Sequence, residues 1–320
     1  MKVCLTGAAG FIGHHCAAAL LDAGHKVVGV DDLNAYYDPA LKRARLARLE
    51  GREGFAFHAF DIAAPGALVE RFAKSGITHI LHLAAQAGVR HSLHAPRDYV
   101  AANLAGQLEV LELARHAGTV EHTVYASSSS VYGERSDVPF RETDATRAPA
   151  SLYAATKIGG EAMAESYARL YGLPLTGLRF FTVYGPWGRP DMAYWLFTDR
   201  ILRGEAITLF DPDAMRRDFT FVDDVSGVME TILKSAPDGH RVYNIGNSTP
   251  VALMDFVRAI ERACGREAVL DIQPRQPGDV SVTYADTSAA EADFGFRAKT
   301  DIAEGLPRFV DWYRGWAKIG

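Results

Sequence analysis

The sequence predicts an α/β protein with a doubly wound parallel sheet and a smaller C-terminal α/β lobe. Apolar, strand-like runs alternate with helical patterns through the first 180 residues, which favours parallel strands joined by right-handed crossovers. Glycines follow the first apolar run, and acidic or polar residues follow several later ones. After residue 180 the chain is rich in Gly, Pro and aromatic residues, with irregular connections. We therefore predict a first domain over 1–180 and a second lobe over 181–320, partly interleaved with the first.

Strands are expected where short apolar runs are bounded by turn-forming or polar residues. These runs cover residues 2–6, 25–30, 55–60, 78–83, 122–126 and 175–179. Helices are expected where apolar residues recur at helical spacing, from residue 14 to a closing Gly24 and over 65–75, 98–117 and 152–171. Ligands of such a sheet bind beyond the carboxyl ends of its strands, so the residues that follow each strand are the first candidates for a site.

The first expected strand is followed at once by GAAGFIG, which contains Gly7, Gly10 and Gly13. Glycines at this spacing allow a tight turn, let a pyrophosphate approach the backbone, and let the next helix pack closely. The N-terminus of that helix directs free N–H groups toward phosphates. Asp31 follows the second strand, where a carboxylate accepts hydrogen bonds from ribose hydroxyls and repels a 2′-phosphate. The pattern predicts a Rossmann-type site for NAD rather than NADP; a glycine-rich turn without a ligand is the alternative.

Tyr153 and Lys157 are four residues apart in a segment that we expect to be helical, so both side chains lie on one helix face. The lysine ammonium favours the phenolate, which at neutral pH needs a pKa about 3 units below its ordinary value. An oxidised nicotinamide adds positive charge nearby. The pair is a candidate acid/base centre, although the same spacing alone is also common on half-exposed helix faces.

Four serines, residues 127–130, end the fifth strand beside this helix. A serine hydroxyl there can donate to a sugar oxygen while Tyr153 takes the proton of that oxygen and a nicotinamide accepts hydride from the attached carbon. A serine-rich turn that satisfies backbone groups is the alternative. Asp31, Asp61, the turn over 84–86 and the serines all follow strands, so we expect them to meet at one edge of the sheet.

Composition argues against other classes of function. The 320 residues are 48% hydrophobic and carry a net charge of −5, which does not indicate a nucleic-acid surface, and the basic segment 42–48 is interpreted as a solvated helix face. His91, His94 and Asp98 are interpreted as part of a loop that enters a helix, and no metal is expected. The three cysteines indicate buried thiols in a reducing compartment. No secretory leader or membrane span of ~18 apolar residues is recognised, so we expect a cytoplasmic protein without a membrane partner.

The segments GAAGFIG, YASSSSVYG and YAATK resemble those of the extended short-chain dehydrogenase/reductases that act on sugar nucleotides, and the similarity covers essentially the whole chain. The resemblance implies that Tyr153 is the acid/base, that Lys157 orients and polarises it, and that Ser128 hydrogen-bonds the sugar. The NAD site predicted on this basis includes Tyr153 and Lys157 together with Gly7, Gly10, Phe11, Ile12, Gly13, Asp31, Asn34, Asp61, Ile62, Leu83, Ala84, Ala85, Gln86, Asn103, Ser127 and Phe180.

Further segments resemble those of UDP-glucuronate 4-epimerases: LRFFTVYGPWGRPDMA, MRRDFTFVDDV, YNIGNSTPVALMDF, QPGDVSVTYADTS and RFVDWY. This resemblance implies that Arg189 and Arg217 bind the UDP diphosphate and that Asp279 reaches the uridine. Thr182 would lie near the sugar, where UDP-galactose 4-epimerases typically have Asn. The remaining substrate candidates are Arg90, Ser128, Ser129 and Ser130.

The residues directly before V-Y-G separate the reaction types. Related dehydratases and decarboxylases place Glu there, and the dehydratases add Asp ahead of it, whereas this chain has Ser129 and Ser130. β-Elimination would lack its general acid and base, so oxidation at C4 should be followed by reduction at C4. The resemblance thus implies interconversion of UDP-glucuronate and UDP-galacturonate, by a homodimer that packs through the helices at 98–117 and 152–171. A UDP-glucuronate decarboxylase, a UDP-glucose 4-epimerase and a non-catalytic NAD-binding sensor or scaffold are the alternatives.

Overall fold

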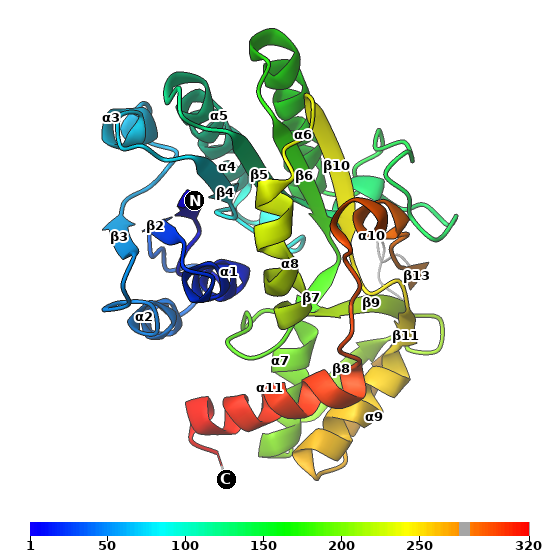
Figure 1. Ribbon diagram of the computed structural model, residues 1–320. Coiled ribbons are helices and arrows are strands. Elements are labelled where there is room, and N and C mark those ends of the chain that lie inside the picture. Colours follow the sequence, from blue (N-terminus) through cyan, green and yellow to red (C-terminus); the bar gives the residue numbers. More distant parts are fainter. Residues whose placement is uncertain (275–281, 320) are drawn as a thin grey trace. The chain divides into compact units, whose positions relative to one another are not determined.

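Figure 1 shows the computed structural model, which describes residues 1–274 and 282–319. The chain divides into two compact units that alternate along the sequence. Unit 1 consists of Met1–Gly133, Ala145–Phe180 and Ser226–Tyr243. Unit 2 consists of Glu134–Asp144, Phe181–Val225 and Asn244–Gly320. Each unit has its own sheet and its own hydrophobic core.

A seven-stranded sheet runs through unit 1 in the order β10-β6-β5-β4-β1-β2-β3. Its strands are β1 (Lys2–Thr6), β2 (Lys26–Asp31), β3 (Phe55–Ala59), β4 (His79–His82), β5 (His122–Ser128), β6 (Leu175–Phe180) and β10 (His240–Ile245), the last of which continues into unit 2. The pairs from β6 to β3 are parallel, which confirms the predicted doubly wound sheet. Strand order reverses at β1, so the carboxyl ends of β1 and β4 mark the position where such sheets bind ligands.

The helices of unit 1 follow the strands in alternation. They are α1 (Phe11–Asp22), α2 (Pro39–Ala47), α3 (Ala67–Phe72), α4 (Pro96–Val100), α5 (Gly106–His116), α6 (Leu152–Tyr171) and the part of α8 (Val222–Lys234) from Ser226 onward. Helix α6 has the predicted bounds and ends at Gly172, whose left-handed φ of 67° terminates it. The helix predicted over 98–117 is interrupted by a π-helical turn at Ala101–Ala105.

Helices α3, α5 and α6 pack side by side against the unit 1 sheet (Figure 1). Leu68 of α3 and Val110 of α5 are fully buried with residues of β1, β2 and β4. Next to them, Ala164 and Ala168 of α6 pack against Tyr125 of β5. Because these α6 side chains are small, the helix lies close to the strands that precede the serine run.

Unit 2 contains a four-stranded sheet, in which β9 pairs with β11, β13 and β7, and a two-stranded sheet of β8 and β12. Its strands are β7 (Thr182–Tyr184), β8 (Ala206–Phe210), β9 (Arg216–Phe221), β11 (Pro250–Ala252), β12 (Val269–Gln273) and β13 (Val282–Thr283). Its helices are α7 (Ala193–Arg203), α9 (Leu253–Cys264), α10 (Ser288–Phe294) and α11 (Ile302–Ala317).

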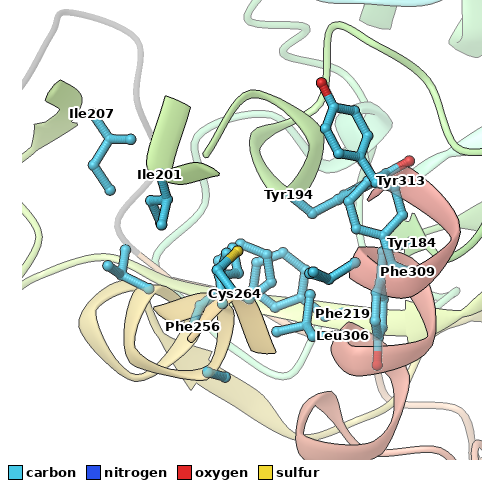
Figure 2. Packing of buried hydrophobic residues seen from close by; sticks show 14 of the residues in the cluster. Tyr184, Tyr194, Ile201, Ile207, Phe219, Phe256, Cys264, Leu306, Phe309 and Tyr313 are labelled. Atoms are coloured by element: carbon cyan, nitrogen blue, oxygen red, sulfur yellow. The ribbon is translucent and has the colours of Figure 1, made fainter. Parts of the chain in front are cut away.

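Aromatic side chains dominate the core of unit 2, as Figure 2 shows. Phe219 of β9 and Phe256 of α9 stack with ring centroids 4.0 Å apart and planes inclined by 2°. Tyr194 of α7 meets Phe309 of α11 edge-on, with centroids 4.9 Å apart. Buried aromatic pairs of this kind remove large apolar areas from water, and they connect the strands and helices of this smaller unit.

The basic segment 42–48 differs from its interpretation as a solvated helix face. Helix α2 begins after Asp38, whose carboxylate accepts a hydrogen bond from the Ala40 N–H. Lys42 and Arg45 are buried, and the Arg45 guanidinium donates to the Ala9 carbonyl at 3.1 Å. The interpretation is wrong for these two residues, because Arg45 binds the glycine-rich loop and Lys42 faces the Asp31 carboxylate at the end of β2. Arg43 and Arg48 are exposed as expected.

The cysteines Cys4, Cys16 and Cys264 are free and buried, as predicted. Burial raises the pKa of the Cys4 and Cys16 thiols to about 12, so both stay protonated at neutral pH. In the part of the chain that the structure describes, no helix has both the length and the apolar character needed to cross a membrane.

Candidate active site

The glycine-rich loop between β1 and α1 forms a backbone cradle. Gly7 has a left-handed φ of 76°, and a Cβ there would lie 2.7 Å from the Ala84 nitrogen at the end of β4. A Cβ on Gly13 would lie 2.0 Å from the Gly7 carbonyl oxygen. Helix α1 is capped by Gly10 with no side-chain hydrogen bond, so its first-turn N–H groups are left to a ligand. This arrangement suits a pyrophosphate, including contacts at the predicted positions Phe11 and Ile12.

Asp31 is fixed at the carboxyl end of β2. Its carboxylate accepts hydrogen bonds from the Ala9 N–H at 3.1 Å and the Leu33 N–H at 2.9 Å. Burial raises the pKa of Asp31 above its usual value, while Lys42 and the two backbone donors oppose that rise. Two backbone donors hold the carboxylate in one orientation, as recognition of a ribose diol requires.

Lys42 is a residue of this region that the sequence reasoning missed. Its Nζ lies 3.8 Å from Asp31 Oδ1 and 3.9 Å from Asp32 Oδ1, and it donates to Asn34 Oδ1 at 3.0 Å. Burial lowers the pKa of the Lys42 ammonium, and both aspartates counteract this. One signal was available: Lys42 and Leu46 have helical i, i+4 spacing and so share a face of α2.

Asn103 lies in the π-helical turn and holds the end of β4 in place. Its Oδ1 accepts from the Gln86 N–H at 2.8 Å, and its Nδ2 donates to the Gln86 carbonyl and to Thr156 Oγ1, each at 3.0 Å. Thr156 directly precedes Lys157, so Asn103 connects the turn after β4 with helix α6. The extra backbone residue of a π turn displaces the side chains around it, which is typical of functional positions.

The other predicted cofactor residues of unit 1 occupy the same edge of the sheet. Asp61 is exposed and accepts from the Ala63 N–H at 2.9 Å, while Ile62 is buried. Leu83, Ala84 and Ala85 are half-buried directly after β4, and Phe180 is buried as the last residue of β6. Their positions at strand ends follow from the parallel sheet.

Tyr153 and Lys157 lie in the first two turns of α6. Ser151 caps this helix by accepting a hydrogen bond from the Ala154 N–H at 3.1 Å. The buried Lys157 Nζ donates to the Ala126 carbonyl of β5 at 2.8 Å, and burial lowers its pKa to about 8. Tyr153 is half-buried, with its ring centroid 6.1 Å from that of Tyr99. A partly accessible phenol one helical turn from a fixed ammonium is suited to proton transfer.

The four serines take different positions. Ser127 donates to Glu161 Oε1 at 2.6 Å, so its hydroxyl is engaged beneath α6. Ser128 lies on the opposite side of the strand, and its Oγ accepts from the Ser130 N–H at 3.2 Å. It thereby caps the 3₁₀ turn η3 (Ser129–Tyr132), in which Ser129 and Ser130 are half-buried. Ser128, the residue predicted to contact the sugar, therefore lies at the end of β5 with its hydroxyl directed to the turn that follows.

Several predicted substrate residues belong to unit 2. Thr182 is half-buried at the start of β7, where it is in register with Phe219 of β9. The Arg189 guanidinium forms a two-pronged ion pair with Asp191, at 3.0 Å from Nε and 2.5 Å from Nη2. Arg217, on β9, is half-buried and donates to the Arg216 carbonyl at 2.9 Å. Asp279 lies outside the described residues.

Arg90 is exposed in unit 1, immediately before the 3₁₀ turn η1 (His91–Leu93). The nearby His91 ring packs against the rings of Tyr36 and Tyr99, with centroids 4.7 and 6.1 Å away. Within residues 1–274 and 282–319, no group of three or more His, Cys, Asp or Glu side chains is placed to hold a metal ion.

The chain matches known proteins over most or all of its length. A model of the NAD dependent epimerase/dehydratase family matches residues 3–246. UDP-glucuronate 4-epimerase 2 of Arabidopsis thaliana is 47% identical over 337 residues, which cover 100% of this chain and 77% of the relative. Protein CapI of Staphylococcus aureus is 44% identical over 99% of this chain and 100% of its own length. The crystal structure of UDP-glucuronic acid 4-epimerase from Bacillus cereus, in complex with UDP-glucuronic acid and NAD, has a TM-score of 0.92 at 32% identity, covering 99% of this chain and 100% of that one.

The Lys42→Met substitution tests whether Lys42 belongs to the cofactor site. It removes the ammonium that faces Asp31 and Asn34 but keeps an unbranched apolar side chain. The amount of nicotinamide dinucleotide that co-purifies with the protein should fall at least about 10-fold, because a charged donor to the ribose region is lost. Dinucleotide released on denaturation is quantified by chromatography. Arg43→Met, at the exposed neighbouring position, is the matched control and should retain the wild-type amount; equal retention by both variants contradicts the role of Lys42.

Proposed function

The chain belongs to the NAD dependent epimerase/dehydratase family, and we propose that it interconverts UDP-glucuronate and UDP-galacturonate by epimerisation at C4. The observation that carries this proposal is the fixed Lys157 ammonium one helical turn from Tyr153, at the sheet edge that also holds Ser128 and the glycine cradle. The similarity to UDP-glucuronate 4-epimerases over the whole chain supports this choice of sugar.

NAD is the cofactor, and the residues of unit 1 fit it. The N-terminus of α1, which has no side-chain cap hydrogen bond, and the Gly7 cradle would receive the pyrophosphate, and Asp31 would receive the adenosine ribose. The carboxylate at this position excludes the 2′-phosphate of NADP. A bound nicotinamide would supply the acceptor and donor of hydride for C4 of the sugar.

Tyr153 moves the proton in this scheme. As phenolate it takes the O4 proton while the C4–H bond breaks, and the sugar becomes a 4-ketone. Lys157 keeps Tyr153 ionised through its positive charge, and Ser128 donates a hydrogen bond to O4. After the ketone has turned, Tyr153 returns the proton to O4 as hydride reaches C4. The product differs from the substrate only in the configuration at C4, so atoms and electrons balance.

The side chains after β5 favour epimerisation over elimination or decarboxylation. Ser129 and Ser130 have no carboxyl group, so no general acid for loss of water from the sugar follows Ser128. The 4-keto intermediate of glucuronate is a β-keto acid, which loses CO₂ when its carboxylate aligns with the carbonyl π system. We propose that Ser129, Ser130 and Thr182 hold the carboxylate out of this alignment by hydrogen bonds.

The UDP moiety is assigned to cationic residues. Arg189 already binds a carboxylate bidentately in its pair with Asp191, which is the geometry that guanidinium groups use for phosphate. Arg217 is the second diphosphate candidate, Asp279 the uridine candidate and Arg90 a further anion-binding candidate. UDP-glucose 4-epimerase and UDP-glucuronate decarboxylase activities remain as outcomes of the tests below.

A homodimer is the proposed assembly. Apolar side chains are exposed on the helices that would form the contact: Val100 (47%) and Leu108 (38%) on the α4–α5 segment, Leu170 (69%) and Tyr171 (42%) on α6. Burying them against a second copy removes apolar surface from water. The three free cysteines support a reducing, cytoplasmic setting for this dimer.

Incubation with UDP-glucuronate and no added cofactor tests the proposed function. NMR should show a mixture of UDP-glucuronate and UDP-galacturonate, because the dinucleotide is regenerated in each cycle and stays bound. Tyr153→Phe should lower the rate at least about 100-fold through loss of proton transfer. UDP-xylose or a 4-keto-pentose as the main product would instead identify a decarboxylase, and turnover of UDP-glucose alone a neutral-sugar epimerase. A protein that retains NAD but turns over neither sugar would instead be a non-catalytic NAD-binding sensor or scaffold.

Thr182→Ala tests protection of the carboxylate. Loss of the hydroxyl frees the carboxylate to align with the 4-keto group, so the fraction of 4-keto-pentose released should rise several-fold. NMR of the products and the CO₂ evolved measure this fraction. Thr208→Ala, on β8 of the same unit, is the control and should leave the fraction unchanged. An unchanged fraction in Thr182→Ala removes this residue from the role.

Leu170→Asp tests the dimer. A charge at a residue that is 69% exposed in the single chain costs little within the subunit but opposes burial between two copies. Analytical ultracentrifugation should show a dimer for wild type and a shift to monomer for the variant. Leu196→Asp, at a residue of α7 that is 45% exposed, should remain dimeric. A monomeric wild type, or a variant that stays dimeric, contradicts the proposed contact.

A further inference from the structure

We propose that the buried Glu161–Arg179 ion pair is a positioning pair for the acid/base centre. Glu161 preserves the charge of Lys157, and Arg179 holds the 3₁₀ turn η3, which contains Ser129 and Ser130. This inference rests on the proposed function, since it assigns these residues a task in the same reaction. Both lie in unit 1, behind the strand ends that hold Ser128, and neither was predicted as a site residue from the sequence.

Glu161 continues the row of active-site residues along α6. It follows Lys157 by four residues, as Lys157 follows Tyr153, so the three share one helix face. Arg179 of β6 grips its carboxylate with two hydrogen bonds, 2.9 Å from Nε to Oε1 and 2.7 Å from Nη2 to Oε2. The Glu161 side chain is 10% exposed and the Arg179 side chain 5%. Ser127 adds a third hydrogen bond to Oε1, at 2.6 Å.

The charge of Glu161 acts on Lys157. Burial lowers the pKa of Lys157 to about 8, and the main opposing influence is the negative charge of Glu161. On the β4 side, Lys157 faces His82, whose pKa falls to about 3 on burial, so this ring is neutral and provides no counter-charge. The Ala126 carbonyl on β5 accepts from the ammonium but carries only a partial charge. Tyr153 alternates between phenolate and phenol in the proposed reaction, so its charge beside Lys157 does not persist through the cycle.

Arg179 connects the same pair to the substrate side. Its Nη1 donates to the Tyr132 hydroxyl at 3.0 Å, and the guanidinium carbon lies 4.9 Å from the centroid of the Tyr132 ring. Tyr132 is 2% exposed and is the last residue of the 3₁₀ turn that Ser128 caps. Arg179 therefore binds two elements of the site at once. One is Glu161 under α6, and the other is the turn that contains Ser129 and Ser130.

Stability alone is a weak reason for such a pair. Two buried charges lose their hydration, and their mutual attraction often does no more than offset that loss, so an apolar pair of similar volume can be equally stable. What an apolar pair lacks is a fixed negative charge one turn from Lys157. The pair thus has a property that the reaction requires and the fold does not.

The Glu161→Gln substitution tests the effect on Lys157. It removes the charge and keeps an acceptor for the hydrogen bonds of Ser127 and Arg179. Without this charge the pKa of Lys157 falls. On raising the pH, the Lys157 ammonium therefore loses its proton earlier than in the wild type. The alkaline limb of the pH profile of kcat/KM for UDP-glucuronate should move to lower pH by about 1 unit. At any pH on that limb, kcat/KM then falls about 10-fold.

Three further variants separate positioning from folding. Glu161→Gln combined with Arg179→Met leaves no unpaired buried charge, so it should fold and show the same shift of the alkaline limb. Glu165→Gln, one turn further along α6, should keep the wild-type profile. Tyr132→Phe removes only the hydroxyl that Arg179 binds, so it should raise KM with the alkaline limb unmoved. If the folded double variant keeps the wild-type limb, the role of Glu161 is overturned; if Tyr132→Phe keeps the wild-type KM, that of Arg179 is overturned.

A readout that needs no turnover distinguishes this inference from the proposed function. The ¹³Cε signal of Lys157 in lysine-labelled protein, assigned by its loss in Lys157→Met, reports the ammonium titration directly. Its midpoint should fall in Glu161→Gln and in the double variant. A fall together with an inactive wild type means that the pair tunes Lys157 while the assigned reaction is wrong. An unmoved midpoint together with an active wild type overturns the role of Glu161 and leaves the epimerase standing.

Discussion

The close packing of α6 on β5 and β6 is the constraint on which the active site depends. Lys157 reaches the Ala126 carbonyl at 2.8 Å, and Glu161 meets the hydroxyl of the next strand residue, Ser127, at 2.6 Å. Two adjacent residues of β5 therefore contact two residues that are one turn apart on α6. A slip of the helix by one turn, about 5.4 Å, would separate both contacts and carry Tyr153 away from the strand end. Small side chains such as Ala164, where α6 meets the sheet, make this approach possible.

Buried charge distinguishes this edge of the unit 1 sheet from an ordinary apolar core. Three cations have little exposure: Lys42 faces the Asp31 carboxylate at the end of β2, Lys157 the Ala126 carbonyl of β5, and Arg179 the Glu161 carboxylate of α6. Burying such groups costs solvation free energy, and that cost is offset only where oriented partners are already in place. The cofactor and the substrate of this site carry charge as well. The preorganised cations and their partners are therefore suited to binding phosphates and to stabilising a phenolate.

Sequence reasoning was most successful where a motif and a strand end coincide. The parallel sheet, the bounds of α6, the glycine cradle and the position of Asp31 follow from the apolar periodicity and from the spacing of glycines and acidic residues along the chain. It failed where tertiary contact overrode a local pattern. Helix α2 looks like a charged surface helix, yet Arg45 points inward to the Ala9 carbonyl of the glycine-rich loop and Lys42 to the Asp31 carboxylate at the end of β2. The polar character of the α2 side chains alone could not indicate which face of the helix would meet these partners.

The fold class, the glycine-rich loop and the spacing of Tyr153 and Lys157 were predictable from the chain alone, and the branch of the family from its resemblance to known motifs. The loop and the Tyr153–Lys157 pair are encoded in residues that are neighbours along the chain or one helical turn apart, and the fold class follows from a succession of such local patterns. Three relations emerged from tertiary contacts: Ser127 lies under α6 while Ser128 caps the next turn, Asn103 ties the turn after β4 to α6, and Glu161 and Arg179 form one buried pair behind Lys157. These relations join residues that are distant in sequence, and they exist because separate strands and helices were brought into register by packing.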